Sequence, residues 1–298
     1  MGSIFSYVKN RLVAMAKRRD HMAGIKFHIY YGLHNLLLKF YKGDYTTTVH
    51  GAEMTMPAEH LLPIYVAMNP LQEKPVIDIA EDIRHRDGFL NLIDIGANIG
   101  DTILMIANRV KPDEILAIEG SDKFYPYLEK NVKRLDAKTK YNLEKTYLSD
   151  VSTDLKVSRT EDYGTGSLKE DPSGQVQSFI TLDDLIAKKY PSVKWNLIKL
   201  DTDGFDFMIM KGAKKYLSSS DTSLFFEFDP VIHIARNEPP LEIFSFLASC
   251  GFTRVIFYNN WGELLLKTEP GNVTMITELI TYTTTYHRFH YDILATKK

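Results

Sequence analysis

The stretch that decides the fold is Leu92-Ile93-Asp94-Ile95-Gly96-Ala97-Asn98-Ile99-Gly100-Asp101, in which a short apolar run ends in a glycine-spaced turn. We predict a strand over residues 92–95, since the run is short and apolar apart from Asp94. The residues that follow, 102–110, carry apolar side chains at helical spacing and predict a helix. A strand, a glycine turn and a helix in this order are typical of α/β proteins.

The same alternation continues along the chain from about Leu90. The predicted strands are residues 92–95, 114–118, 141–148, 195–200, 223–228, 253–258 and 291–295. The predicted helices are residues 102–110, 123–135, 181–190, 206–217 and 241–249. Residues 149–180 look irregular, with turns indicated by Gly164, Gly166, Pro172 and Gly174. Because strands that alternate with helices imply a sheet covered on both faces, we predict a doubly wound, mostly parallel, seven-stranded, Rossmann-like sheet.

Residues 1–50 differ from the rest and predict a basic, amphipathic helical extension to a domain of residues 51–298. Before Asp44 this extension carries eight Lys and Arg against one acid, Asp20. Apolar residues recur at helical spacing: Ile4, Val8, Leu12, Met15, Ile25, Ile29, Leu33, Leu36, Leu37 and Phe40. Two interpretations stay open. The apolar stripe packs on the main domain as a cap with solvated lysines, or residues 1–45 contact an anionic membrane or an acidic substrate. The start Met1-Gly2-Ser3-Ile4-Phe5-Ser6 also matches the acceptor pattern for N-myristoylation.

Composition narrows the class of protein. With 44% hydrophobic and 25% charged residues in 298, the chain is typical of a soluble globular protein. The net charge of -2 gives no reason to expect nucleic acid as a partner. The single cysteine, Cys250, excludes an intrachain disulfide or a CxxC metal site and suits a reducing, cytoplasmic compartment. No apolar run approaches the roughly 18 residues that cross a bilayer.

The glycine turn is a candidate cofactor site, because ligands bind beyond the carboxyl ends of the strands in such sheets. Gly96 and Gly100 allow a tight turn and a close approach of the backbone to a ligand. Asn98 stands where a dinucleotide fingerprint has its middle glycine. With Asp94 before it, the loop suits the zwitterionic methionine end of S-adenosylmethionine.

Two further acids follow predicted strands. Glu119 ends the second strand, 19 residues beyond Gly100, where it can accept hydrogen bonds from both ribose hydroxyls. Asp150 follows the third strand and can accept from the adenine amine, although a turn aspartate is an equally simple interpretation.

The fourth and fifth strands end in groups that suit catalysis. Asp201 and Asp203 follow the fourth strand, and Glu227 and His233 lie at or beyond the end of the fifth. One acid can serve as general base for an acceptor hydroxyl, or Asp201 and Asp203 can hold a divalent metal ion that acidifies it. In a third interpretation Asp201 and Asp203 line a polar cofactor rim. His233 has a suitable intrinsic pKa for a base but also suits a structural role.

Together these motifs resemble the FkbM-type methyltransferase family of class I S-adenosylmethionine-dependent enzymes. The matching segments are residues 93–101, 118–119, 148–150, 181–185, 198–204, 211–213 and 291–295. The loop of residues 96–101 in combination with residues 199–204 is the specific part. This chain departs from the usual family pattern at Asp203, where Glu is common, and at Gly120, where Pro is frequent.

The resemblance implies that Asp94, Gly96 and Asn98 line the methionine end, Glu119 the ribose and Asp150 the adenine. It also implies methyl transfer to oxygen, so we predict an O-methyltransferase for a hydroxyl of a carbohydrate, glycolipid or natural product. Two alternatives remain. A nicotinamide-dependent oxidoreductase is disfavoured by Asn98, and a non-catalytic module that binds a membrane or partner is disfavoured by the retained acids.

Overall fold

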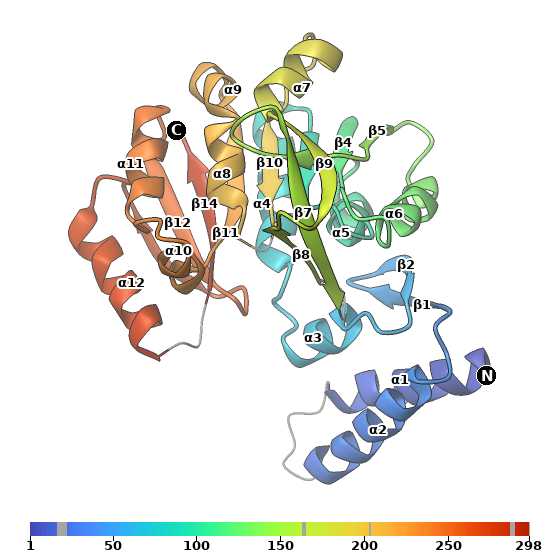
Figure 1. The fold of residues 1–298 in the computed structure, drawn as a ribbon. Helices are drawn as coiled ribbons and strands as arrows, with labels where there is room; N and C mark the ends of the chain where they lie inside the picture. The colour runs from blue at the N-terminus through green and yellow to red at the C-terminus, as the bar shows by residue number, and fades with distance from the viewer. Residues whose placement is uncertain (17–22, 163–164, 203, 287–289, 298) are drawn as a thin grey trace.

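The computed structural model describes residues 1–16, 23–162, 165–202, 204–286 and 290–297, and it confirms the predicted doubly wound α/β fold. In these ranges the main sheet has eight strands in the order β13-β12-β14-β11-β10-β3-β4-β5, with helices on both faces (Figure 1). In that order the strands are Leu264–Thr268, Arg254–Asn259, Tyr291–Thr296, Ser223–Phe228, Leu197–Leu200, Asn91–Ile95, Glu114–Ile118 and Lys140–Glu144.

The sheet is built outward from β3 in two directions. The chain passes from β3 to β4 and β5, then returns to the other side of β3 with β10 and β11, and all these strands pair in parallel. The late strand β14 is antiparallel to both β11 and β12. The strand order therefore reverses between β3 and β10, where a doubly wound sheet opens its ligand-binding crevice. The seven predicted strands all have counterparts, and the edge strand β13, which pairs with β12, is an eighth that the sequence did not predict.

Two apolar cores separate the sheet from its helices. The first core contains Leu92 and lies under α4, α5 and α6, which are Lys74–Asp87, Asp101–Arg109 and Tyr125–Asn131, the last followed by a short 3-10 helix, Val132–Arg134. The second contains Ile93 and Ile95 and lies under α7 (Leu182–Lys189), α8 (Asp206–Lys211), α9 (Lys214–Ser219), α11 (Glu242–Ser249) and α12 (Val273–Tyr286). Since successive residues of a strand face opposite sides, the apolar residues of β3 serve both cores. The short helix α10, Pro230–Ala235, follows β11.

The helix predicted over residues 206–217 is divided into α8 and α9. Gly212 ends α8, and a Cβ atom there would lie 2.1 Å from the carbonyl oxygen of Ser149. Glycine at this position lets the backbone approach Ser149 more closely than a side chain would permit. The cap predicted for the preceding helix is confirmed, because the Thr181 side chain accepts from the Asp184 amide.

The segment between β5 and α7 was predicted wrongly in two respects. The strand expected over residues 141–148 ends at Glu144, and Tyr147–Leu148 forms β6 in a separate sheet. The stretch expected to be irregular forms the rest of that sheet, in the order β6-β9-β7-β8, with β9 at Gln175–Ile180, β7 at Thr153–Asp162 and β8 at Thr165–Glu170. Three of the six β9 side chains are polar, all six are at least partly exposed, and the three apolar ones do not alternate with polar ones, so β9 lacked the hydrophobic alternation that would have predicted a strand.

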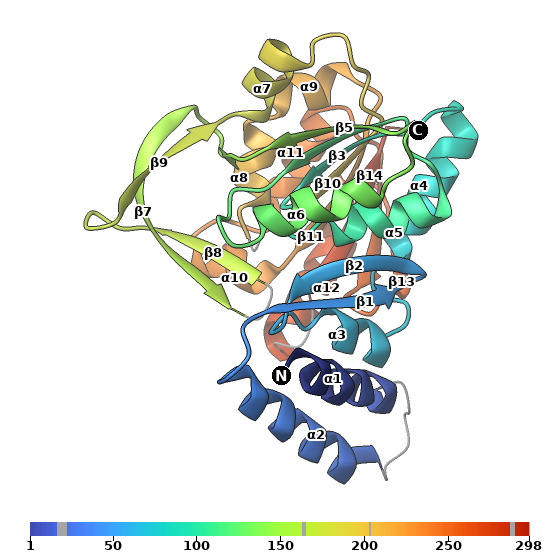
Figure 2. The ribbon, with the colours of Figure 1, turned by 90° about the vertical axis from the view of Figure 1, so that its right-hand side faces the viewer.

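The N-terminal extension begins with the two predicted helices, α1 (Gly2–Ala16) and α2 (Ala23–Leu38). A hairpin of β1 (Asp44–Val49) and β2 (Ala52–Pro57) follows, and then α3 (Leu62–Met68). The predicted boundary at residue 50 falls in the turn of this hairpin, and the division into two domains stays a prediction. Figures 1 and 2 both show α2 at the outer end of the molecule, with α1 between it and α3.

Two expectations for this extension were wrong. Lys9 is not solvated but fully buried, and its Nζ donates to the carbonyl oxygens of Ala58 at 2.6 Å and His60 at 2.7 Å. Several predicted stripe residues do not pack on the main domain but are exposed: Ile4, Ile29, Leu33, Leu36 and Phe40. Among the described helices, none is long and apolar enough to span a membrane.

Candidate cofactor and active site

The glycine turn between β3 and α5 has the conformation that its sequence indicates. Gly96, Asn98 and Gly100 all have positive φ angles, of 74°, 50° and 80°. A Cβ atom at Gly96 would lie 2.0 Å from the backbone oxygen of Asp201, so only glycine lets this loop cross the end of β10. The amides of Gly96 and Ala97 both donate to the Ile118 carbonyl at 3.0 Å, which fixes the turn against β4.

Glu119 joins this loop to the end of β4. One of its carboxylate oxygens accepts from the Asn98 amide at 2.7 Å, and the other accepts from the Ser121 amide at 2.7 Å. Burial raises the pKa of Glu119, and these two amide donors oppose that rise. Because each carboxylate oxygen can accept more than one hydrogen bond, both oxygens retain capacity for a further donor. The neighbouring Gly120 lies against Tyr147, whose ring would be 2.3 Å from a Cβ atom there, and this accounts for the absence of a larger residue.

A buried ion pair that the sequence analysis did not identify lies beneath the loop. Lys199 is paired with Asp94 across β10 and β3, and its Nζ lies 3.2 Å from the Asp94 carboxylate and 3.4 Å from that of Asp201. Burial alone would lower the pKa of Lys199, but these carboxylates outweigh it and raise the pKa well above its usual value. Asp94 is fully buried, whereas the Asp201 side chain is 49% exposed and accessible to a ligand.

A row of polar groups extends from this pair along the carboxyl edge of the sheet. Glu227 on β11 is the register partner of Asp292 on the antiparallel strand β14. The Nε2 atom of His290, just before β14, lies 3.8 Å from a Glu227 carboxylate oxygen. Burial raises the pKa of Asp292 to about 7, and the Asp201 charge adds to this rise. Burial lowers the pKa of His290, and the charges of Asp201 and Asp229 oppose the change.

Three more acids with raised pKa values surround Lys199 from the helix side. Burial, with Asp101 and other carboxylates nearby, raises the pKa of Glu73 to about 8. The same cause raises the pKa of Asp101 to about 6 and that of Asp206 to about 7. Glu73 has a positive φ of 65° and accepts a 3.5 Å hydrogen bond from Thr102 at the start of α5. Groups with perturbed pKa values cluster at functional sites, and this edge of the sheet shows such a cluster.

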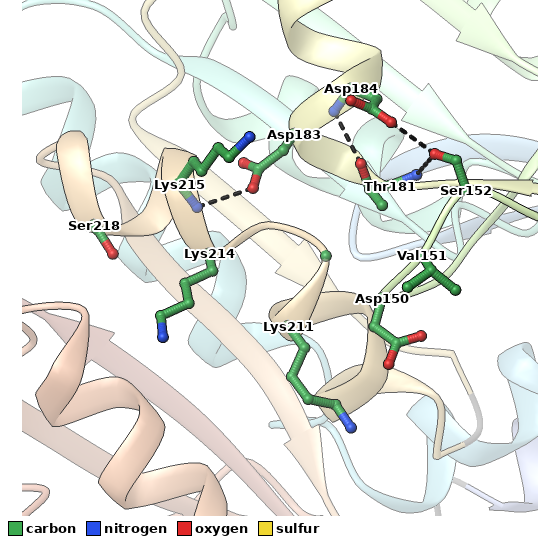
Figure 3. A pocket seen from close by; sticks show the side chains of 11 residues that line it. Asp150, Val151, Ser152, Thr181, Asp183, Asp184, Lys211, Lys214, Lys215 and Ser218 are labelled. Carbon is green, nitrogen blue, oxygen red and sulfur yellow. Dashed lines mark hydrogen bonds between the residues drawn. The ribbon is translucent and has the colours of Figure 1, made fainter.

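Other predicted residues lie outside this cluster. Asp150 lines a pocket between the β6–β7 connection, α7 and α9, together with Lys211, Lys214 and Lys215 (Figure 3). Its contact with adenine stays a prediction. Asp183, in the same pocket, accepts from the amides of Lys215 and Tyr216 and so caps α9.

His233 does not join the acids of the candidate site. It is 2% exposed, packs against the rings of Phe207 and Phe228, and its Nδ1 lies 3.0 Å from a Glu238 carboxylate oxygen. This geometry suits the structural interpretation, and nothing in it supports the predicted role as a base. The histidine that lies beside Glu227 is His290.

The metal hypothesis gains no support from the geometry. Asp203, one of its two predicted ligands, lies outside the described residues. Within the part of the chain that the structure describes, no group of three or more His, Cys, Asp or Glu side chains is arranged to hold a metal ion.

Comparisons with known proteins place the chain in a family. A profile of the methyltransferase FkbM domain matches residues 94–254. No curated protein matches the chain. Among solved structures, a methyltransferase FkbM from Methylobacillus flagellatus KT is 13% identical with a TM-score of 0.41, and the match covers 70% of this chain but 43% of that one. A precorrin-6y C5,15-methyltransferase from Geobacter metallireducens GS-15 is 16% identical with a TM-score of 0.40, covering 74% and 87% of the two chains. TYW2 from M. jannaschii, solved in complex with AdoMet, is 13% identical with a TM-score of 0.40 and covers 86% of each chain.

The matched segment is more than half of the 298 residues. It runs from the buried Asp94 through the loop, Glu119 and the Lys199 pair to the beginning of β12. The chain belongs to the methyltransferase FkbM family.

Proposed function

We propose that this protein transfers a methyl group from S-adenosylmethionine to a hydroxyl of a carbohydrate, glycolipid or natural product. The observation that carries the proposal is the contact between the glycine loop and Glu119, whose carboxylate oxygen accepts a hydrogen bond from the Asn98 amide nitrogen at 2.7 Å. Loop and acid meet at the carboxyl edge next to the reversal of strand order, where this fold binds nucleotides. Because the chain has a single cysteine, Cys250, we include a reducing, cytoplasmic compartment in the proposal.

The residues present fit this cofactor. Beyond its ion pair with Lys199, the buried Asp94 carboxylate has no hydrogen-bond partner among the described side chains, so it has accepting capacity left for the ammonium of the methionine end, which it would reach through a bridging water molecule. Glu119 can accept from the ribose hydroxyls with the capacity that its two amide donors leave free. The cofactor itself supplies an activated methyl group on a sulfonium.

The acceptor side of the site is formed by the groups beyond β10 and β11. Asp201 is accessible, and one of its carboxylate oxygens lies 3.4 Å from the Nζ atom of Lys199, an ion pair that helps to hold the side chain in place. Glu227 and His290 provide a second group that can take a proton from an acceptor hydroxyl. Since the methyl donor is already activated, these residues mainly have to align the hydroxyl and remove its proton.

Membership of the methyltransferase FkbM family argues against the nicotinamide-dependent oxidoreductase. The non-catalytic alternative differs from our proposal in one measurable respect, because a module without activity would not turn over the cofactor.

The test is a calorimetric titration of the full chain with S-adenosylmethionine and, separately, with NADH. We expect binding of S-adenosylmethionine only. The substitution Glu119→Ala should weaken binding by about 1–3 kcal/mol, because charge-assisted hydrogen bonds to the ribose are lost.

Glu114→Ala is the matched control, since Glu114 begins the same strand at the opposite edge of the sheet. It should leave the affinity unchanged, and circular dichroism should show both variants folded. Equal affinity of the folded Glu119→Ala variant and the wild type would refute the ribose assignment.

A further inference from the structure

An apolar stripe, which we call the outer stripe, runs along the outward side of α2 and into the turn that follows it: Ile29, Leu33, Leu36 and Phe40. Spacings of four and three residues place Ile29, Leu33 and Leu36 on one side of the helix, and Phe40 follows in a turn in which its amide donates to the Leu37 carbonyl at 3.0 Å. Each is between 42% and 67% exposed. The opposite side of α2 contains His34 and Leu38, which are buried. The helix therefore has one apolar side that the protein covers and a second that it leaves exposed.

The position of α2 keeps the outer stripe away from the rest of the protein. α2 packs on α1, and α1 in turn packs on α3, so α2 forms the outermost layer in both views (Figures 1 and 2). On α1, Ile4 and Tyr7 are also exposed. Large exposed apolar surfaces on one element indicate an interaction site rather than ordinary surface variation.

The charge of the extension indicates which partner covers this stripe. Residues 1–43 carry eight Lys and Arg and one acid, whereas the rest of the chain carries 28 Lys and Arg against 37 Asp and Glu. Of the eight, Arg11, Lys39 and Lys42 are exposed in the described structure, and Lys9 is buried. A helix that combines an apolar side with cationic neighbours is typical of binding in the plane of an anionic membrane. A second copy of this chain on the same stripe would bring two cationic extensions together and is disfavoured by repulsion.

We propose that the outer stripe of α2 inserts into the surface of an anionic lipid membrane, with Lys39 and Lys42 contacting the headgroups. The attachment uses residues remote from the cofactor site, so it does not depend on the proposed function. It would hold the protein at the membrane from its N-terminal end.

The experiment is co-sedimentation of the full chain with vesicles. One set contains equal parts of phosphatidylcholine and phosphatidylglycerol, and the other contains phosphatidylcholine alone. We expect the wild type to pellet with the anionic vesicles, less with the neutral ones, and less at high salt. The double variant Leu33→Gln/Leu36→Gln should partition at least about tenfold more weakly, because it removes apolar area that would enter the lipid.

The matched control is Leu264→Gln/Leu265→Gln, which changes two comparably exposed leucines on the edge strand β13. It should pellet as the wild type does. The pair Lys39→Gln/Lys42→Gln should lower binding to the anionic vesicles by about tenfold and hardly change binding to the neutral ones. Circular dichroism of each variant shows whether the fold is intact.

Three results would overturn the proposal. The first is that the wild type stays in the supernatant with anionic vesicles, and the second is that the Leu33→Gln/Leu36→Gln variant pellets as the wild type does. The third is a wild-type dimer, seen by sedimentation velocity without lipid, that the same substitutions dissociate, which would identify a second copy as the partner.

Discussion

Two lysines are buried among the described residues, and their surroundings drive their pKa values in opposite directions. Lys199, at the carboxyl edge of the sheet, lies between the carboxylates of Asp94 and Asp201, and its pKa rises well above the usual value. Lys9, at the joint between α1 and the main body, donates to the carbonyl oxygens of Ala58 and His60. Burial lowers the pKa of Lys9 to about 7, with Glu59 opposing the change.

The comparison distinguishes Lys199, whose charge is part of the candidate cofactor site, from Lys9, whose hydrogen bonds connect α1 to the main body. Lys199 remains a cation because the surrounding carboxylates raise its pKa. Its charge offsets those of acids that a polar ligand would also contact. Lys9 needs only acceptors, which the two carbonyl oxygens supply, and its Nζ also lies 4.4 Å from the centre of the Tyr45 ring. His60, held by Lys9 through its carbonyl, places its Nε2 atom 3.4 Å from the Asn98 side chain, so the joint reaches the cofactor loop.

The largest effect should come from Lys199→Met. This change leaves the fully buried Asp94 without its counter-ion, and breaking a buried pair in this way typically costs about 3–5 kcal/mol. The free energy of unfolding, measured by guanidinium denaturation, should fall by that amount.

Lys194→Met is the control, since Lys194 is exposed and precedes the same strand. It should change stability by less than about 0.5 kcal/mol. A Lys199→Met protein as stable as this control would show that Asp94 does not need the ion pair.

A smaller effect is expected from Lys9→Met. Methionine retains most of the buried side-chain volume but leaves the carbonyls of Ala58 and His60 without a donor, at a cost of about 1–3 kcal/mol. No buried charge is left behind, so the loss should be smaller than for Lys199→Met. The same denaturation experiment measures it.

Lys39→Met tests the same chemical change on an exposed lysine of the extension and should have little effect on unfolding. If Lys9→Met destabilised the protein as much as Lys199→Met, the distinction between the buried ion pair of Lys199 and the carbonyl hydrogen bonds of Lys9 would be wrong.

The smallest effect is a pair of opposite pH dependences. Glu73, beside Lys199, has its pKa raised from 4.5 to about 8. Between these pH values the folded protein holds a proton that the unfolded chain has released, so the free energy of unfolding falls as pH rises from 4.5 to about 8. Lys9 has its pKa lowered from 10.5 to about 7, so the unfolded chain holds the extra proton, and stability rises with pH between 7 and 10.5. Between pH 7 and 8 the two slopes oppose each other.

We therefore expect the wild type to change little in this interval. Lys9→Met should become less stable with rising pH, and Glu73→Gln more stable, each by up to about 1.4 kcal/mol per pH unit. Denaturation at a series of pH values measures both slopes, and identical slopes in the two variants would contradict these assignments.

The main sheet was predictable because its strands are apolar and its turns contain glycine. Strand β13 was not predicted although it begins with the apolar run Leu264-Leu265-Leu266, and the other parts that failed lack those local signals. Strand β9 has three polar and three apolar side chains without regular alternation, and the division between α8 and α9 depends on how closely Gly212 approaches Ser149 from a distant segment.

For the candidate site, the loop and Glu119 were recognised because their spacing is local in sequence. Lys199 was recognised only as part of the segment that resembles the family, since its pairing with Asp94 depends on the register of two strands about a hundred residues apart. His290 and Asp292 come next to Glu227 only because β14 returns antiparallel to β11. Glu73 precedes the family match, at the N-cap of α4, a helix that was not predicted.

The most direct test of the central claim is a crystal structure of the full chain soaked with S-adenosylhomocysteine. We expect the ribose hydroxyls within hydrogen-bond distance of Glu119 and the amino-acid end beside residues 94–100. A nucleoside bound at another edge of the sheet, with Glu119 contacting only the amides of Asn98 and Ser121, would contradict the proposed cofactor site.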